Sequence, residues 1–240
     1  MIRSFLLAAL SLGVVLTGSL SFAAPQSSRV ERLKASIEQI ALQNMTNIGS
    51  RPEVRRQLDK MIVELRQEAG AVNEAAWVRY APGSWQQIWS DERDMSPPNA
   101  PQQNLAQIYQ YVSVEGWGYN FGERLIPGRG AVTFALAVQG SVQGHEQTTE
   151  ITKAYFRASE LLRNEDIEML SVALQNGAGE SVSFVEREAG KFPNGPIGAK
   201  GVLSLEFLDQ DLKIGYTRNV YTQDLELFVM KRVQGVIKTP

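Results

Sequence analysis

Hydrophobic residues near the start of the chain recur at the three- and four-residue spacing of an amphipathic helix. Two segments carry such a stripe: Val30, Leu33, Ile37, Ile40 and Ala41 form the first, and Val54, Leu58, Met61, Ile62 and Leu65 form the second. A capping-box serine precedes each segment, Ser28 with Glu31 and Ser50 with Glu53. Because the opposite faces mix both signs of charge, the stripes are typical of core packing rather than of a membrane-surface helix. We predict an antiparallel helix pair that covers another part of the protein.

From Trp77 onward the pattern changes from helical to alternating, which predicts strands. The predicted strands are Ile108–Val114, Gly116–Glu123, Val132–Gln139, Glu150–Arg157, Val182–Arg187, Val202–Leu208, Leu212–Thr217 and Leu225–Val233. Gly140–Gly144 and Asp209–Asp211 are typical of hairpin connections. Strands this numerous and this close together indicate an antiparallel sandwich or barrel, not a parallel sheet with crossover helices.

Two segments lack a regular pattern. Asp91–Pro101 is polar and rich in proline, and Lys191–Gly201 is dense in glycine and proline. Both are predicted to be exposed loops. They act either as lids or contact surfaces at the rim of a barrel, or as disordered connections.

The first residues have the pattern of an export signal. Arg3 gives a short basic start, Phe5–Leu16 form an apolar stretch, and Ser21, Phe22 and Ala23 form a small-x-small cleavage site. We expect cleavage after Ala23. The alternative is a retained membrane anchor, against which the short and interrupted apolar stretch argues. The predicted organisation is a signal peptide (1–23), a helical segment (24–72) and a β-barrel (73–240) that forms one domain with the helices.

Charge and composition argue against several classes of function. The chain has 24 Lys and Arg against 26 Asp and Glu, so it lacks the positive surplus that holds a nucleic-acid backbone. It has no Cys, which excludes thiol catalysis and thiolate metal sites. His145 is the only His, and it lies beside a predicted hairpin tip, where a surface turn residue is expected. We therefore expect no nucleic-acid partner, no metal and no cofactor.

Carboxylates gather at Asp209, Asp211 and Asp224, whereas no nucleophile-elbow, Walker or dinucleotide motif is present. Paired acids can serve glycoside hydrolysis or bind calcium. The alternative is turn chemistry, in which Asp209 pairs with Lys213 or Arg218. We favour it, because aspartates in a tight strand connection are typical of a turn. We accordingly expect a protein that is not an enzyme.

Aromatic residues gather on two predicted strands. Alternation puts Trp85 and Trp89 on one face of the first, and Trp117, Tyr119 and Phe121 on one face of the second. Along Ala131–Val138 the large residues share one face and the small residues share the other. A face of small residues leaves room for either a covering helix or a ligand. The alternative is an ordinary filled core, which aromatic residues dominate in any case.

Two segments carry a resemblance to a known family. Gly83–Trp89 (GSWQQIW) and Gly201–Arg218 (GVLSLEFLDQDLKIGYTR) resemble the plastid lipid-associated proteins, also called fibrillins or plastoglobulins. That family has a G-x-W strand and, near its end, a Y-L-D-x-x-L-R-I-x-R segment. The similar positions here are Phe207, Leu208, Asp209, Leu212, Lys213, Ile214 and Arg218, with Lys213 standing where arginine is usual. A secretory signal in place of a transit peptide indicates a bacterial, cyanobacterial-like member.

The resemblance implies a mainly β protein, a lipocalin-like antiparallel β-barrel capped by the helix pair, which binds lipids, prenylquinones or carotenoids at membranes without catalytic residues. We expect export to the periplasm or thylakoid lumen, with peripheral membrane contact. The proposed ligand-binding residues are Trp85, Trp89, Trp117, Tyr119 and Phe121, with Asp209 and Arg218 as polar anchors. One alternative is a structural or interaction protein whose filled barrel docks on a membrane complex. Another is an acid-dependent hydrolase that uses Asp209 with Asp211 or Asp224.

Overall fold

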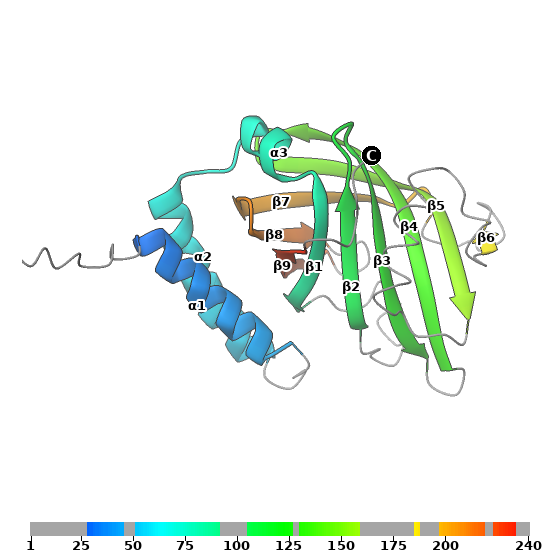
Figure 1. Cartoon of the computed structure of the whole chain (residues 1–240), viewed down its shortest axis with the longest axis horizontal. Helices are drawn as coiled ribbons and strands as arrows, with labels where there is room; N and C mark the ends of the chain where they lie inside the picture. The colour runs from blue at the N-terminus through cyan, green and yellow to red at the C-terminus, as the bar shows by residue number, and fades with distance from the viewer. Residues whose placement is uncertain are drawn as a thin grey trace, which may run out of the picture.

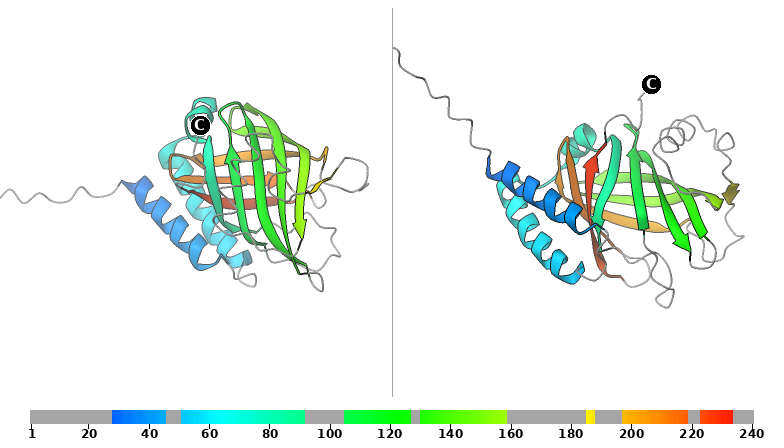
Figure 2. Two further views of the ribbon diagram at one scale, coloured as in Figure 1. Left: turned by 45° about the vertical axis from the view of Figure 1, so that its right-hand side comes forward. Right: turned by 60° about the horizontal axis from the view of Figure 1, so that its bottom comes forward.

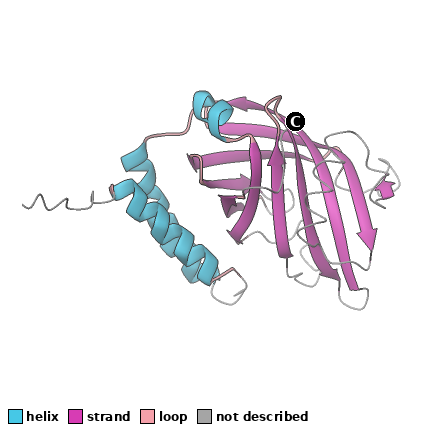
Figure 3. Cartoon of the chain, viewed as in Figure 1, coloured by secondary structure: helices cyan, strands magenta, loops and turns pink. Residues whose placement is uncertain are grey.

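The computed structural model describes residues 28–45, 51–91, 105–126, 130–158, 185–187, 197–218 and 223–233. The described elements comprise helices before a mainly β region (Figures 1 and 3). The helices are α1 (Arg29–Gln43), α2 (Arg51–Ala69) and α3 (Glu74–Tyr80). The strands are β1 (Gly83–Ser90), β2 (Leu105–Val112), β3 (Trp117–Ile126), β4 (Gly130–Gln143), β5 (Glu146–Ala158), β6 (Val185–Arg187), β7 (Lys200–Leu208), β8 (Leu212–Arg218) and β9 (Leu225–Arg232).

Eight of these strands close into an antiparallel barrel. The hydrogen-bonded order is β1-β2-β3-β4-β5-β7-β8-β9, and β9 pairs back with β1. The ninth strand, β6, lies outside this ring and pairs with Ala154–Phe156 of β5. This arrangement confirms the predicted antiparallel barrel with N-terminal helices, and closure leaves no long unpaired edge among the described strands of the ring.

The helix pair α1–α2 lies against the outer face of the barrel over β1, β7, β8 and β9 (Figure 2). Its predicted apolar stripes supply the buried side chains of this interface, which confirms the prediction of a covering pair. The interface contains Ile37, Ala41, Val54, Leu58, Ile62 and Leu65 of the helices with Ile88, Trp89, Phe207, Leu212, Ile214, Leu227 and Val229 of the strands. Ser28 caps α1 as predicted, since its hydroxyl accepts a hydrogen bond from the Glu31 amide at 3.2 Å. The second predicted cap, Ser50, lies outside the described residues.

The prediction that the alternating pattern begins at Trp77 is wrong, because Trp77 lies within α3. Asn73 caps this helix, and its side-chain oxygen accepts a hydrogen bond from the Ala76 amide at 3.0 Å. A seven-residue helix spans only about two turns, so it gives no clear periodicity. Trp77 and Ala81 pack with Trp85 at one end of the barrel, and α3 therefore covers that end (Figure 1).

The hairpin predicted at Gly140–Gly144 is shorter in the structure, since β4 continues to Gln143 and the turn is Gly144–His145. Gly140 lies within a strand pair, where a Cβ atom would come 2.5 Å from the Thr148 carbonyl oxygen. Its glycine permits close backbone approach rather than a turn. Gly144 has a φ of 63° and provides the turn itself. The Asp209–Asp211 connection between β7 and β8 is confirmed.

Most of the predicted loop at Asp91–Pro101 lies outside the described residues, as do Val182–Phe184 and residues 1–27 with the predicted signal peptide. In the predicted loop Lys191–Gly201, the described part is a turn at Ile197–Gly198, followed by Lys200 and Gly201 at the start of β7. The strand predicted at Val202–Leu208 therefore begins two residues earlier than expected.

Candidate functional site: the barrel cavity

The barrel contains a partly open cavity of about 180 Å³ whose wall includes residues from all eight barrel strands. The apolar and aromatic residues of the wall are Ile108, Tyr111, Val112, Trp117, Phe134, Leu136, Val138, Leu203, Phe228 and Met230. The polar residues are Gln87, Gln110, Asn120, Gln139, Gln147, Thr149 and Thr217. A mainly apolar wall with several polar groups is compatible with a small-molecule site.

The two faces of β4 have different roles. Phe134, Leu136 and Val138 point into the cavity. The opposite face carries Ala135 and Ala137, which pair across to Phe121 and Tyr119 of β3. The small residues predicted to leave room thus accommodate aromatic rings on the outside of the barrel, and the cavity lies against the large residues instead.

Tyr119 and Phe121 point away from the cavity, because they alternate along β3 with Gly118 and Asn120, which line it. On the outer face their rings join those of β2. The ring centres of Tyr109 and Phe121 lie 6.1 Å apart, and those of Trp117 and Tyr119 lie 5.4 Å apart. The expected aromatic cluster therefore exists, but Trp117 is its one member from β3 that also reaches the cavity wall.

The prediction that Trp85 and Trp89 share one face is wrong. A β-bulge lies between Gln87 and Trp89, since Gln87 pairs with Met230 while Trp89 pairs with Val229. The extra residue reverses the alternation, so Trp85 lies inside the barrel and Trp89 packs under the helix pair. Trp89 is therefore separated from the cavity by the sheet.

Trp85 fills the end of the barrel covered by α3 and is absent from the cavity wall among the described residues. Its indole Nε1 donates to the Ala81 carbonyl at 2.9 Å. The Arg232 guanidinium lies 4.1 Å from its ring centre and donates to the carbonyl oxygens of Pro82, at 2.8 Å, of Tyr80 and of Gln210. Gly83 leaves space for that guanidinium, because a Cβ atom there would come 2.4 Å from Arg232 Nη1. The G-x-W segment thus closes the barrel end.

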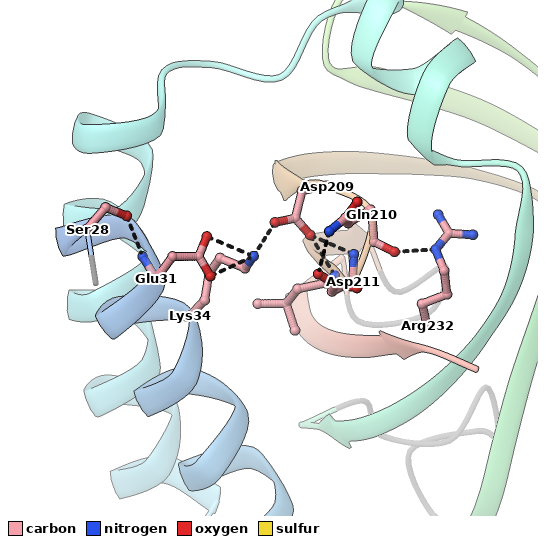
Figure 4. A network of polar contacts seen from close by, with 8 residues as sticks. Ser28, Glu31, Lys34, Asp209, Gln210, Asp211 and Arg232 are labelled. Carbon is pink, nitrogen blue, oxygen red and sulfur yellow. Dashed lines mark hydrogen bonds and ion pairs between the residues drawn. The ribbon is translucent and has the colours of Figure 1, made fainter. Parts of the chain in front are cut away.

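Asp209 organises the β7–β8 turn (Figure 4). Its Oδ1 accepts hydrogen bonds from the amides of Asp211 and Leu212, both at 2.8 Å. Its Oδ2 forms an ion pair with Lys34 of α1 at 2.5 Å. The favoured interpretation as turn chemistry is confirmed, but the predicted partners were wrong, since Lys34 takes the place of Lys213 or Arg218. Helix packing brings Lys34 to this turn, which no local pattern indicates.

Arg218 lies at the other end of β8 from Asp209, where its side chain is exposed and donates to the Gln223 carbonyl at 3.0 Å. A strand of seven residues spans roughly 20 Å. Asp209 and Arg218 are therefore too far apart to hold one ligand head group together, and neither lines the cavity.

Lys213 is a buried polar residue inside the barrel that sequence reasoning missed as a site residue, as it missed Gln110 and Asn120 of the wall. It is 1% exposed, and its Nζ lies 4.7 Å from the centre of the Trp85 ring. Nζ donates to Gln110 Oε1, and Gln110 Nε2 donates to Asn120 Oδ1 at 2.8 Å. Among the described residues no carboxylate forms an ion pair with Lys213. Burial, and then the positive charge of Arg232, lower the pKa of Lys213 well below its ordinary value.

A signal for Lys213 does exist in the sequence. On β8 the apolar residues Leu212, Ile214 and Tyr216 alternate with Lys213, Gly215 and Thr217. The apolar set faces the helix pair, so the other set must face the barrel interior. Only the location of the helix pair distinguishes the outer face of β8 from the face that points into the barrel.

No known family model matches this chain, and a comparison with curated proteins found no match either. Within the described ranges, no group of three or more His, Cys, Asp or Glu residues is placed to hold a metal ion. Among the described helices, none has the length and apolar character needed to cross a membrane.

Proposed function

We propose that this protein is an exported, non-enzymatic binding protein that holds an apolar small molecule, such as a lipid, a prenylquinone or a carotenoid, in the barrel cavity. The observation that carries this proposal is an unfilled space of about 180 Å³ whose wall is mostly aliphatic and aromatic. A dry apolar cavity of about 150 Å³ is large enough to bind benzene. This space can therefore take a ring or a length of chain, with the remainder of a longer ligand extending outward.

The cavity favours a binding protein over a barrel filled by its own side chains. In a filled barrel the large side chains of β4 would meet the side chains of the facing strands across the interior, as in any close-packed core. Instead Phe134, Leu136 and Val138 border open space.

The hydrolase alternative has weaker support, because both carboxylate oxygens of Asp209 already bind the turn amides and Lys34.

The resemblance to the plastid lipid-associated proteins agrees with this proposal. Its two segments form the first barrel strand and the β7–β8 hairpin, and the lipocalin-like fold that it implies agrees with the closed barrel. We propose from it a ligand drawn from photosynthetic or cell membranes, peripheral contact of the protein with that membrane, and a location in the periplasm or thylakoid lumen.

The site that we propose replaces most of the sequence-based set. Trp117 borders the cavity although its ring packs with Tyr119 in the outer cluster, and the inward-facing contacts are made by Phe134, Leu136, Val138 and Phe228. The remaining members of that set, Trp85, Trp89, Tyr119, Phe121, Asp209 and Arg218, support the barrel, the helix interface or the loops.

The test is to purify the mature chain from its own host, extract it with organic solvent and identify the extract by mass spectrometry. Val138→Trp should abolish binding, because the larger ring fills the cavity. Val114→Trp is the matched control, since Val114 is 79% exposed in the β2–β3 turn. The wild type and the control should carry one ligand species and show tryptophan quenching on titration with it. A wild-type extract without ligand, together with no quenching by any added lipid, quinone or carotenoid, would refute the proposal.

A further inference from the structure

The hydrogen-bond chain from Lys213 to Asn120 has only one consistent direction. A lysine amine in contact with an amide oxygen must donate, and an amide oxygen can only accept. Lys213 therefore fixes the oxygen of Gln110 on its own side and turns Gln110 Nε2 toward Asn120. That group in turn fixes Asn120 Oδ1, so Asn120 Nδ2 is the free end of the chain.

The residue at the free end of this hydrogen-bond chain lines the cavity. Asn120 lies on the cavity wall, and among the described residues its Nδ2 has no hydrogen-bond partner. A buried or partly buried N–H group without an acceptor costs free energy, and a ligand oxygen can recover that cost. The cavity thus offers N–H donors at a defined point of an otherwise apolar wall.

The charge at this end of the cavity also favours a ligand oxygen over a ligand cation. The Arg232 guanidinium carries the positive charge at this end, and it lies 4.1 Å from the centre of the Trp85 ring that Lys213 Nζ also contacts. This end of the interior therefore repels cations and favours electron-rich atoms.

We infer that the cavity selects ligands whose polar end is an acceptor-only oxygen, a carbonyl or a carboxylate, and that Asn120 binds this oxygen while Lys213 and Gln110 orient Asn120. The inference rests on the proposed binding function and narrows its ligand class. An alcohol fits less well, because its oxygen can accept from Asn120 Nδ2 but its own hydroxyl hydrogen then needs a separate acceptor. A primary ammonium is excluded on both hydrogen-bonding and charge grounds. Asn120 is the contact residue, and Lys213 is a positioning residue.

The experiment is calorimetric titration of the full mature chain, produced ligand-free, with 2-decanone, decanoate, 2-decanol and decylammonium. The ketone and the carboxylate should bind about fivefold more tightly than the alcohol, the value of one net hydrogen bond, and the ammonium should bind most weakly.

Variants separate recognition from general loss of the cavity. Asn120→Leu should remove the ketone-over-alcohol preference and keep alcohol binding. Thr149→Val is the matched control: it also lies on the cavity wall, but its hydroxyl already donates to the Gly201 carbonyl at 3.3 Å, so the preference should persist. Lys213→Met should relax the preference to within about twofold, because both amides are then free to rotate.

The outcomes are distinct. Equal binding of ketone, alcohol and ammonium to the wild type overturns this inference and leaves the binding function intact. A preference that survives Asn120→Leu also overturns it. Failure of all four probes to bind overturns both the inference and the proposed function.

Discussion

At the scale of single residues, Lys213 shows how a charged side chain can be accommodated inside a barrel. Among the described residues its amine has one hydrogen-bond acceptor, Gln110, and lies over the Trp85 ring, which the Arg232 guanidinium also contacts. Burial, and then the positive charge of Arg232, make the protonated form costly, which explains why the pKa of Lys213 is lowered. Because its amine contacts Gln110, Lys213 can orient an amide that faces a ligand.

The lowered pKa of Lys213 has a consequence for stability. Between that lowered pKa and the ordinary value of 10.5, the unfolded chain binds more protons than the folded chain, so the contribution of Lys213 to stability rises with pH. Lys213→Met removes this dependence. Relative to the variant, the wild type should therefore gain unfolding free energy as the pH rises toward 10.5. Urea denaturation at several pH values measures the difference, and the exposed Lys200→Met serves as the control. A gap that does not change with pH would contradict the assignment.

Gly83 is a second residue whose identity is fixed by its surroundings. Its φ is 119°, and a Cβ atom would come 2.4 Å from Arg232 Nη1. Gly83→Ala should destabilise the protein by about 1–3 kcal/mol, since it strains the backbone and displaces the guanidinium from Trp85. Gly144→Ala is the control, because Gly144 also has positive φ but nothing lies within 4 Å of its added Cβ. Equal losses of stability in the two variants would show that the contact with Arg232 is unimportant.

At the scale of elements, polar contacts at both ends of the interface attach the helix pair to the barrel. Arg55 of α2 donates to Asp59, to Asp91 after β1 and, at 3.1 Å, to the Leu225 carbonyl of β9. Tyr216 of β8 donates to Asp59 at 2.8 Å, and burial, followed by this hydrogen bond, raises the pKa of its phenol. At the other end, Lys34 of α1 reaches the β7–β8 turn through Asp209 (Figure 4). Apolar burial holds the helices on, and these contacts fix their position.

The partly buried Arg55 should therefore matter more than an exposed arginine of the helix pair. Arg55→Met should lower the free energy of unfolding by about 1–3 kcal/mol, because it leaves Asp91 and the Leu225 carbonyl without this donor. Arg29→Met is the matched control: the Arg29 side chain is 57% exposed and pairs with Glu64 and Glu68, so its loss should cost at most about 1 kcal/mol. Chemical denaturation of both variants compares them directly. A larger loss for Arg29→Met would show that the contacts of Arg55 do not fix the position of the helix pair.

At the scale of the whole molecule, the predictable part of the fold is the part that local periodicity encodes. The helix stripes and most strands follow from spacing within single segments, so both were predicted. The bulge before Trp89 depends on pairing with β9, and the inner position of Lys213 depends on helices that cover the outer face of β8. In a barrel covered on one side both faces are partly apolar, so alternation alone does not distinguish inside from outside. For this reason the sequence predicted a cavity, but it did not predict most of the residues that line it.

The helix pair that covers the barrel should also be needed for cooperative folding of the chain. The outer face beneath α1 and α2 exposes Trp89, Phe207, Ile214 and Val229 if the pair is absent. An apolar patch of this kind favours association and partial unfolding. A chain that begins at Val72 should therefore aggregate or bind a hydrophobic dye such as ANS, whereas the chain that begins at Ala24 should unfold in one cooperative transition. Calorimetry and dye binding distinguish the two. If the barrel without α1 and α2 unfolds cooperatively at an unchanged midpoint, the helices are an accessory layer and the view of one folding unit is wrong.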